Sequence, residues 1–109
     1  MAKILLVNFD EERATRLAGF LRTERYEVCI NSETEKFSQM LKWHVCGIDL
    51  VILDASHREK YVRDLLTEIA SYRARNGARP MVLCISRVYR GPRFRLDLER
   101  KGARFLYVE

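Results

Sequence analysis

Short apolar runs alternate with longer segments of helical character along the chain, and this alternation constrains the fold more than any other feature. The first, third and fourth runs are almost continuously apolar, which is typical of central strands covered on both faces, whereas the mixed second run suits an edge. Strands that alternate with helices imply parallel pairing through right-handed crossovers, and therefore an α/β fold. The five predicted strands span residues 3–7, 26–30, 49–54, 81–86 and 104–108.

Apolar residues between these runs recur at helical spacing. After the first run, Ala14, Leu17, Ala18 and Leu21 share one face, and Asp10 is well placed to cap the helix that carries them. Three further helices are predicted, one between Ser32 and Gly47 and two over residues 58–75 and 94–101.

The length and composition fit one soluble domain. The 109 residues are 48% hydrophobic and 32% charged, which is typical of a globular protein and not of a disordered chain. No apolar run approaches the ~20 residues of a membrane-spanning helix, and the N-terminus lacks the features of a signal peptide. We therefore expect a single domain over residues 1–109, located in the cytoplasm and without membrane contact.

The three cysteines, Cys29, Cys46 and Cys84, are widely spaced and form no C-x-x-C pair. His44 and His57 do not have the spacing of metal ligands either. Because all three cysteines lie in apolar stretches, we expect buried thiols in a reducing compartment rather than a metal or redox site.

The net charge of +5 is concentrated late in the chain, where arginines are frequent. A solvated arginine-rich face is the simpler interpretation, and a basic nucleic-acid-binding protein on an α/β scaffold is the alternative. Against the alternative, the sequence contains no helix-turn-helix, zinc-finger or aromatic RNA-binding motif. Binding to nucleic acid is therefore not expected.

Polar residues follow the strands at the edge of the sheet where ligands collect in open parallel α/β folds. The flavodoxin-like strand order 2-1-3-4-5 would bring the ends of the first, third and fourth strands together. Asn8 or Asp10, Asp54 and Ser86 should then surround one shallow site. We expect the carboxylate of Asp54 at the rim of the sheet, outside the core. A cap on the following loop is the alternative role for Asp54 and for Ser86.

Four segments resemble response-regulator receiver domains, the phosphoaccepting modules of two-component signalling. KILLVNFDEE is similar to the family's first strand, DLVILDAS to the strand with the phosphoacceptor aspartate, and PMVLCIS to the strand that ends in Thr or Ser. GARFLYVE is similar to the motif around the fifth strand. The matches follow the family order, and they imply that Asp54 is the phosphoacceptor candidate and Ser86 a phosphate contact, in a receiver-like three-layer sandwich.

The chain departs from the family pattern at the positions that drive phosphorylation. The acidic pair after the first strand falls on Asn8 and Phe9, and the lysine of the fifth strand falls on Glu109, which reverses its charge. The family's Mg²⁺ ion is held by carboxylate oxygens, which a phenyl ring cannot replace. Asn8, Asp10 and Ser56 remain as weak candidate ligands, and Asp10 suits a helix cap better.

The family's fifth helix has no counterpart in these 109 residues, which end at Glu109 just after the last predicted strand. Apolar side chains of that strand should then face water or a partner, and exposed apolar patches commonly mark interfaces. We expect a histidine kinase, an output protein or a second copy of the chain to bind at the strand-five side. The alternative is that a following segment of a longer chain carries the fifth helix.

These features predict a degenerate receiver-like signalling domain that acts through protein–protein contact. Phosphorylation of Asp54 with Mg²⁺ should be weak or absent, and binding of Mg²⁺ itself is doubtful. No Gly-rich phosphate loop follows the first strand, and no nucleophile–base arrangement is visible, so an enzyme of this fold is not expected.

Overall fold

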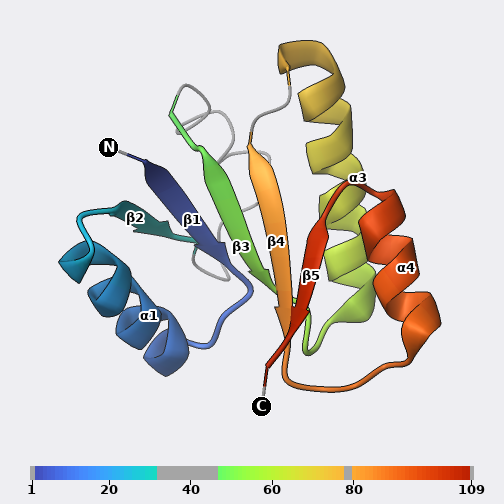
Figure 1. The fold of residues 1–109 in the computed structure, drawn as a ribbon, viewed down its shortest axis with the longest axis horizontal. Helices are drawn as coiled ribbons and strands as arrows, with labels where there is room; N and C mark the ends of the chain where they lie inside the picture. The colour runs from blue at the N-terminus through green and yellow to red at the C-terminus, as the bar shows by residue number, and fades with distance from the viewer. Residues whose placement is uncertain (1, 32–46, 78–79, 109) are drawn as a thin grey trace.

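The computed structural model describes residues 2–31, 47–77 and 80–108, and five strands in these ranges form one sheet. All neighbouring strands are parallel, and their order is β2-β1-β3-β4-β5, as predicted (Figure 1). The predicted edge position of the second strand is confirmed, and so are the central positions of the first, third and fourth. The strands are β1 (Lys3–Val7), β2 (Glu27–Ile30), β3 (Leu50–Asp54), β4 (Met81–Ser86) and β5 (Arg104–Tyr107).

The described helices are α1 (Glu11–Thr23), α3 (Glu59–Asn76) and α4 (Pro92–Arg100). Asp10 caps α1 as predicted, because its Oδ1 accepts a hydrogen bond of 2.8 Å from the backbone N–H of Arg13. Helix α4 begins at Pro92, two residues earlier than predicted. Proline is tolerated at the first helical position, because the N–H that it lacks would have no partner within the helix there.

Several predictions concern residues outside the described ranges. The helix expected between Ser32 and Gly47 falls in residues 32–46, together with Cys46 and His44. Glu109 also lies outside the described residues.

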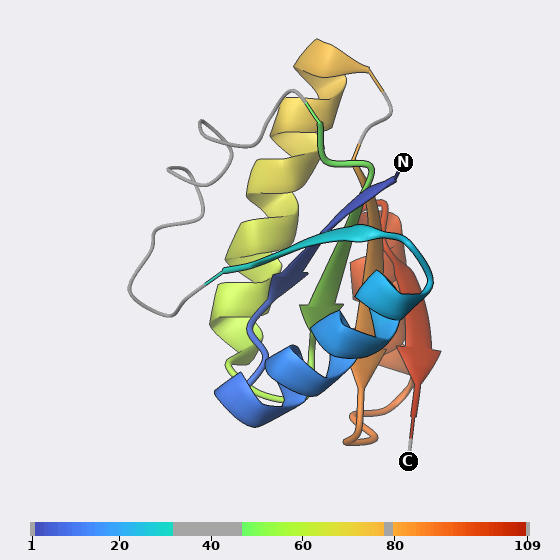
Figure 2. The same ribbon diagram turned by 90° about the vertical axis from the view of Figure 1, so that its left-hand side faces the viewer.

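The two faces of the sheet bury separate apolar clusters, and each cluster is closed by different helices. Figure 1 shows α1 on one side of the strands and α3 and α4 on the other, and Figure 2 shows the same arrangement with α1 in front. The cluster beneath α1 contains Ile4, Leu6, Phe9, Ala14, Ala18, Val28 and Ile52. The cluster beneath α3 and α4 is larger and includes Leu5, Val7, Val51, Leu53, Leu66, Ile69, Phe94 and Leu98. Alternate residues of β1 and β3 therefore point to opposite layers, which explains their continuously apolar sequences.

Cys84 lies within the α3–α4 cluster as a buried free thiol, as predicted, whereas Cys29 is half-buried. Burial raises the pKa of the Cys84 thiol to about 12, so the group stays protonated at neutral pH. A protonated buried thiol is a poor nucleophile, and Cys84 acts here as a small apolar side chain.

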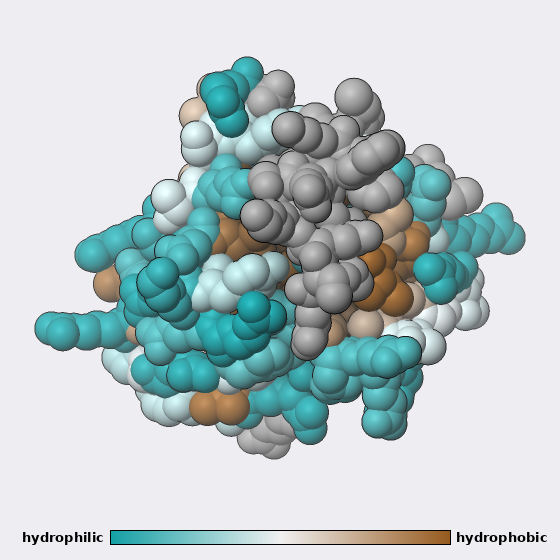
Figure 3. All heavy atoms as spheres, turned by 180° about the vertical axis from the view of Figure 1, so that it is seen from behind, coloured by the Kyte–Doolittle hydropathy of each residue, from teal (hydrophilic) through white to brown (hydrophobic). Residues whose placement is uncertain are grey.

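Outside this core the described surface is largely polar. Seen from behind, hydrophilic residues cover most of the described surface, and hydrophobic residues show in separate patches (Figure 3). Among the described residues, no helix combines the length and the apolar character that crossing a membrane requires.

Gly102 and Gly19 provide a matched test of backbone conformation. Gly102 has φ +91°, and a Cβ atom there would lie 2.9 Å from Nη1 of Arg73. We expect Gly102→Ala to lower the free energy of unfolding by about 1–2 kcal/mol, because L-residues are strained at this φ. Gly19 lies exposed within α1 with open space around it. Gly19→Ala should raise the same free energy by roughly 0.5–1 kcal/mol, since alanine favours helices. Urea unfolding measures both, and equal effects would contradict the described backbone.

Candidate functional site

The carboxyl ends of β1, β3 and β4 meet at one edge of the sheet, as predicted. Val7 pairs in register with Leu53, and Asp54 pairs with Ile85. Asn8 directly follows β1, and its Nδ2 donates a hydrogen bond of 2.9 Å to the backbone oxygen of Asp54. The structure therefore brings the predicted strand ends together, and the hydrogen bonds of their side chains determine what the site can bind.

Asp54 ends β3 at the rim of the sheet, as expected, but its carboxylate is fully buried, so the expectation that it stands outside the core is wrong. Its Oδ2 accepts a hydrogen bond of 2.6 Å from Nη1 of Arg13, which makes a short ion pair. Its Oδ1 accepts a hydrogen bond of 2.9 Å from the backbone N–H of Ser56. Each oxygen of the buried carboxylate thus accepts a hydrogen bond from a donor of the protein itself.

Arg13 is the residue of this site that the sequence interpretation missed. It stands in the first turn of α1, and side chains of a helix tilt toward its N-terminus, which here faces the end of β1. Its guanidinium carbon lies 5.4 Å from the centroid of the Phe9 ring, and Nη1 lies 4.0 Å from Oδ2 of Asp10. A ring face and a second carboxylate therefore hold the guanidinium in place over Asp54. The signal in the sequence was a cation in the first turn of the helix that follows the first strand.

The two positions that correspond to the acidic pair offer no free oxygen to a metal. Asn8 has φ +68°, and its Nδ2 is bonded to the backbone of Asp54 and, at 3.3 Å, to that of His57. Its Oδ1 accepts a hydrogen bond of 3.4 Å from Nη1 of Arg58. Phe9 is buried in the apolar cluster beneath α1. Asn8 therefore ties two strand-end loops together, and Phe9 belongs to the core.

The two candidate serines are bonded within loops. Oγ of Ser86 donates a hydrogen bond of 2.7 Å to the oxygen of Val88 and accepts one of 3.1 Å from its N–H. Ser86 is buried and caps the loop after β4. This is the alternative role that the sequence predicts for it. Oγ of Ser56 accepts a hydrogen bond of 2.9 Å from the backbone N–H of Arg87. Neither hydroxyl is bonded to the Asp54 carboxylate among the described contacts.

These residues do not fit Mg²⁺. Magnesium requires several oxygen ligands in octahedral geometry, and the carboxylate of Asp54 already carries Arg13 on one oxygen. Asp10 is used by the cap of α1. In residues 2–31, 47–77 and 80–108, no group of three or more His, Cys, Asp or Glu side chains is arranged to hold a metal ion. The positive charge beside Asp54 comes from an arginine of this chain.

The structure is similar to solved receiver domains over almost its full length. A response regulator receiver domain protein from Clostridium thermocellum matches with a TM-score of 0.81 and 19% identity, over 98% of this chain and 82% of that one. The signal receiver domain of a DNA-binding response regulator from Colwellia psychrerythraea 34H matches with 0.76 and 20%, over 98% and 85%. The beryllofluoride-activated NtrC4 receiver domain dimer matches with 0.71 and 17%, over 100% and 85%. No protein-family model and no curated protein sequence matches the chain. The chain therefore has the receiver fold, with a five-stranded parallel sheet in the order 2-1-3-4-5.

Removing Arg13 tests its role beside Asp54. We expect Arg13→Met to lower the free energy of unfolding at pH 7 by about 2 kcal/mol, because a buried carboxylate loses its countercharge. Adding Asp54→Asn to Arg13→Met should recover most of this loss. Arg16→Met is the matched control, since Arg16 is exposed and pairs with Glu12, and its effect should stay within about 0.5 kcal/mol. Equal losses for the two arginine variants in urea unfolding would refute the described ion pair.

Proposed function

We propose that this chain is a receiver-like signalling domain of the two-component type that acts through protein–protein contact. In this proposal residues 1–109 form one domain without enzymatic activity, and Mg²⁺-dependent phosphorylation of Asp54 is weak or absent. The observation that supports it most directly is the 2.6 Å ion pair between Nη1 of Arg13 and Oδ2 of Asp54.

Phosphoryl transfer to a carboxylate needs an accessible oxygen as nucleophile, and a metal ion usually offsets the charge that gathers in the transition state. Asp54 offers no exposed oxygen, and the nearby carboxylate of Asp10 caps α1 and lies 4.0 Å from Nη1 of Arg13. To accept a phosphoryl group, the carboxylate would first have to lose Arg13, at the cost of an uncompensated buried charge.

The departures of the sequence from the family pattern support the same conclusion. Asn8 and Phe9 occupy the positions of the family's acidic pair, and Glu109 occupies the position of its lysine. Each change removes a group that would bind Mg²⁺ or phosphate, while Arg13 supplies the cation that the buried carboxylate requires. The site is therefore suited to hold one conformation permanently rather than to switch on phosphorylation.

The strand-five side is the surface that we assign to partner contact. β5 is an edge strand, and Leu106 and Tyr107 on it are 50% and 44% exposed. Edge strands and exposed apolar side chains both favour association with another chain. The partner is a histidine kinase, an output protein or a second copy, and the matched NtrC4 receiver domain was solved as a dimer. Light scattering at rising concentration separates these classes, because only a second copy doubles the mass.

Phosphorylation tests the proposal directly. After incubation with Mg²⁺ and acetyl phosphate, intact mass should show no phosphate adduct on the wild-type chain. The double variant Phe9→Asp/Glu109→Lys should also remain unmodified, because Arg13 still pairs with Asp54. Adding Arg13→Ala to that double variant should allow an adduct that Asp54→Asn abolishes. A stoichiometric adduct on the wild-type chain that disappears in Asp54→Asn would overturn the proposal.

A further inference from the structure

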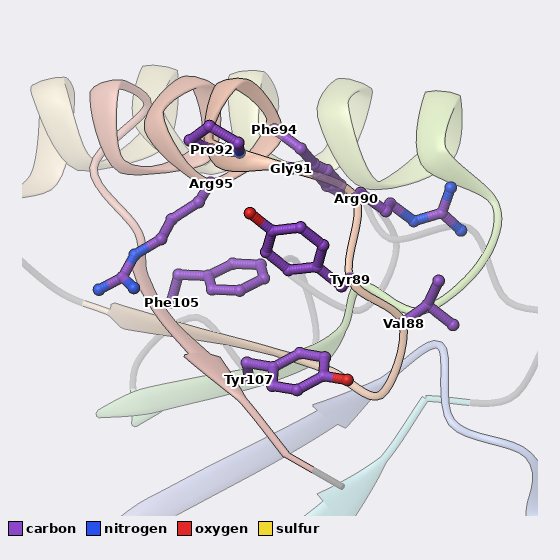
Figure 4. A pocket seen from close by; sticks show the side chains of 9 residues that line it. All are labelled: Val88, Tyr89, Arg90, Gly91, Pro92, Phe94, Arg95, Phe105 and Tyr107. Atoms are coloured by element: carbon purple, nitrogen blue, oxygen red, sulfur yellow. The ribbon is translucent and has the colours of Figure 1, made fainter.

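An apolar pocket lies between the loop after β4, helix α4 and strand β5. Its floor is formed by Phe94, which is buried, and Phe105, with ring centroids 6.1 Å apart. Its walls are Tyr89 and Tyr107, which meet edge to face at 6.3 Å. Figure 4 shows the rings of Tyr89, Phe105 and Tyr107 gathered around one space. We call the site formed by these four residues the aromatic pocket.

The size of the aromatic pocket restricts what it can accept. The cavity measures about 160 Å³, well below the roughly 300–1,000 Å³ of pockets that enclose cofactors and other small molecules. A space of this size suits one large apolar side chain. Tyr89 is 73% exposed, so this wall of the pocket is accessible to a partner.

The walls of the aromatic pocket are flanked by arginines. Arg90 and Arg95 line the pocket from opposite sides (Figure 4). The guanidinium carbon of Arg90 lies 5.6 Å from the centroid of the Phe94 ring, and that of Arg95 lies 6.0 Å from the centroid of the Phe105 ring. Arg90 also pairs with Glu59 at 3.6 Å and Arg95 with Glu99 at 3.0 Å.

Residues 87–108 contain seven basic and two acidic side chains, so this segment alone carries the net charge of +5 of the whole chain. Four exposed arginines of this segment make no ion pair with any described residue, namely Arg87, Arg93, Arg100 and Arg104.

This positive charge favours some classes of ligand for the pocket over others. A second copy of the chain would bring the same arginines to the contact, and like charges would repel. A nucleobase could stack on the aromatic rings beside the arginines, and the oligo(dT) measurement below tests this occupant separately. An acidic protein segment satisfies both features, because its carboxylates face the arginines and an apolar side chain fills the cavity.

We propose that the aromatic pocket binds one large apolar side chain of an acidic protein segment, with the flanking arginines pairing with the carboxylates on either side. The inference rests on the proposed function, since it names the chemistry of the partner at the strand-five side. At protein interfaces, much of the binding energy commonly comes from an aromatic side chain that fills a small pocket with charge pairs around it.

The probe is a short fluorescently labelled synthetic peptide with one phenylalanine between runs of glutamate, measured by fluorescence anisotropy. We expect saturable binding that weakens with added salt. The same peptide with alanine in place of phenylalanine should bind at least about fivefold more weakly, as should the peptide with glutamine in place of glutamate. Equal binding of the alanine peptide would overturn the role of the cavity, and equal binding of the glutamine peptide would overturn the role of the arginines.

Variants of the protein test whether the peptide binds in the aromatic pocket. Tyr89→Ala and Arg95→Gln should each weaken binding of the phenylalanine peptide by about fivefold or more. Phe20→Ala is the control for Tyr89, because Phe20 is 63% exposed on α1. Arg16→Gln is the control for Arg95, because both arginines are exposed and pair with a glutamate four residues away. Unchanged binding by Tyr89→Ala, or equal losses in the controls, would overturn the proposal.

Two outcomes separate this inference from the proposed function. If the peptide does not bind and the wild-type chain also takes no phosphate from acetyl phosphate, the inference fails and the proposed function stands. If a labelled oligo(dT) binds instead and Tyr89→Ala abolishes that binding, the pocket serves single-stranded nucleic acid and the inference is wrong.

Discussion

The ion pair between Arg13 and Asp54 is the interaction on which the rest of the site depends. It joins α1 to the end of β3 across 41 residues of sequence. A buried carboxylate is stable only with a partner that offsets its loss of hydration, and Arg13 supplies that partner within the chain. Because the guanidinium also lies against Phe9 and Asp10, the start of α1 and the end of β1 are held to the same point.

Hydrogen bonds extend from this pair to the loops after β3 and β4, at the carboxyl edge of the sheet. The N–H of Ser56 is bonded to Asp54, its Oγ accepts from the backbone of Arg87, and its backbone oxygen accepts from the guanidinium of Arg90. Arg90 also lines the aromatic pocket. The loops after β3 and β4 are therefore connected by contiguous hydrogen bonds that run from Asp54 to a residue of this pocket.

The sheet and its strand order match those of solved receiver domains, and the polar side chains at its carboxyl edge bond to one another. The fold and the chemistry of such a site can vary independently. A parallel sheet is stabilised by its buried apolar residues, whereas its function depends on the few side chains at its carboxyl edge.

The sequence alone determined the fold and the location of the site. Continuous apolar runs at β1, β3 and β4 specify strands buried on both faces, and the cap at Asp10 specifies the start of α1, because these signals depend on near neighbours. Only the tertiary structure decided what the site contains. Arg13 reaches Asp54, and Tyr89 meets Tyr107, through contacts between residues far apart in sequence, which no local periodicity encodes. Burial of Asp54 follows from the position of α1 over the end of β3, and so it appears only when the helix is packed on the sheet.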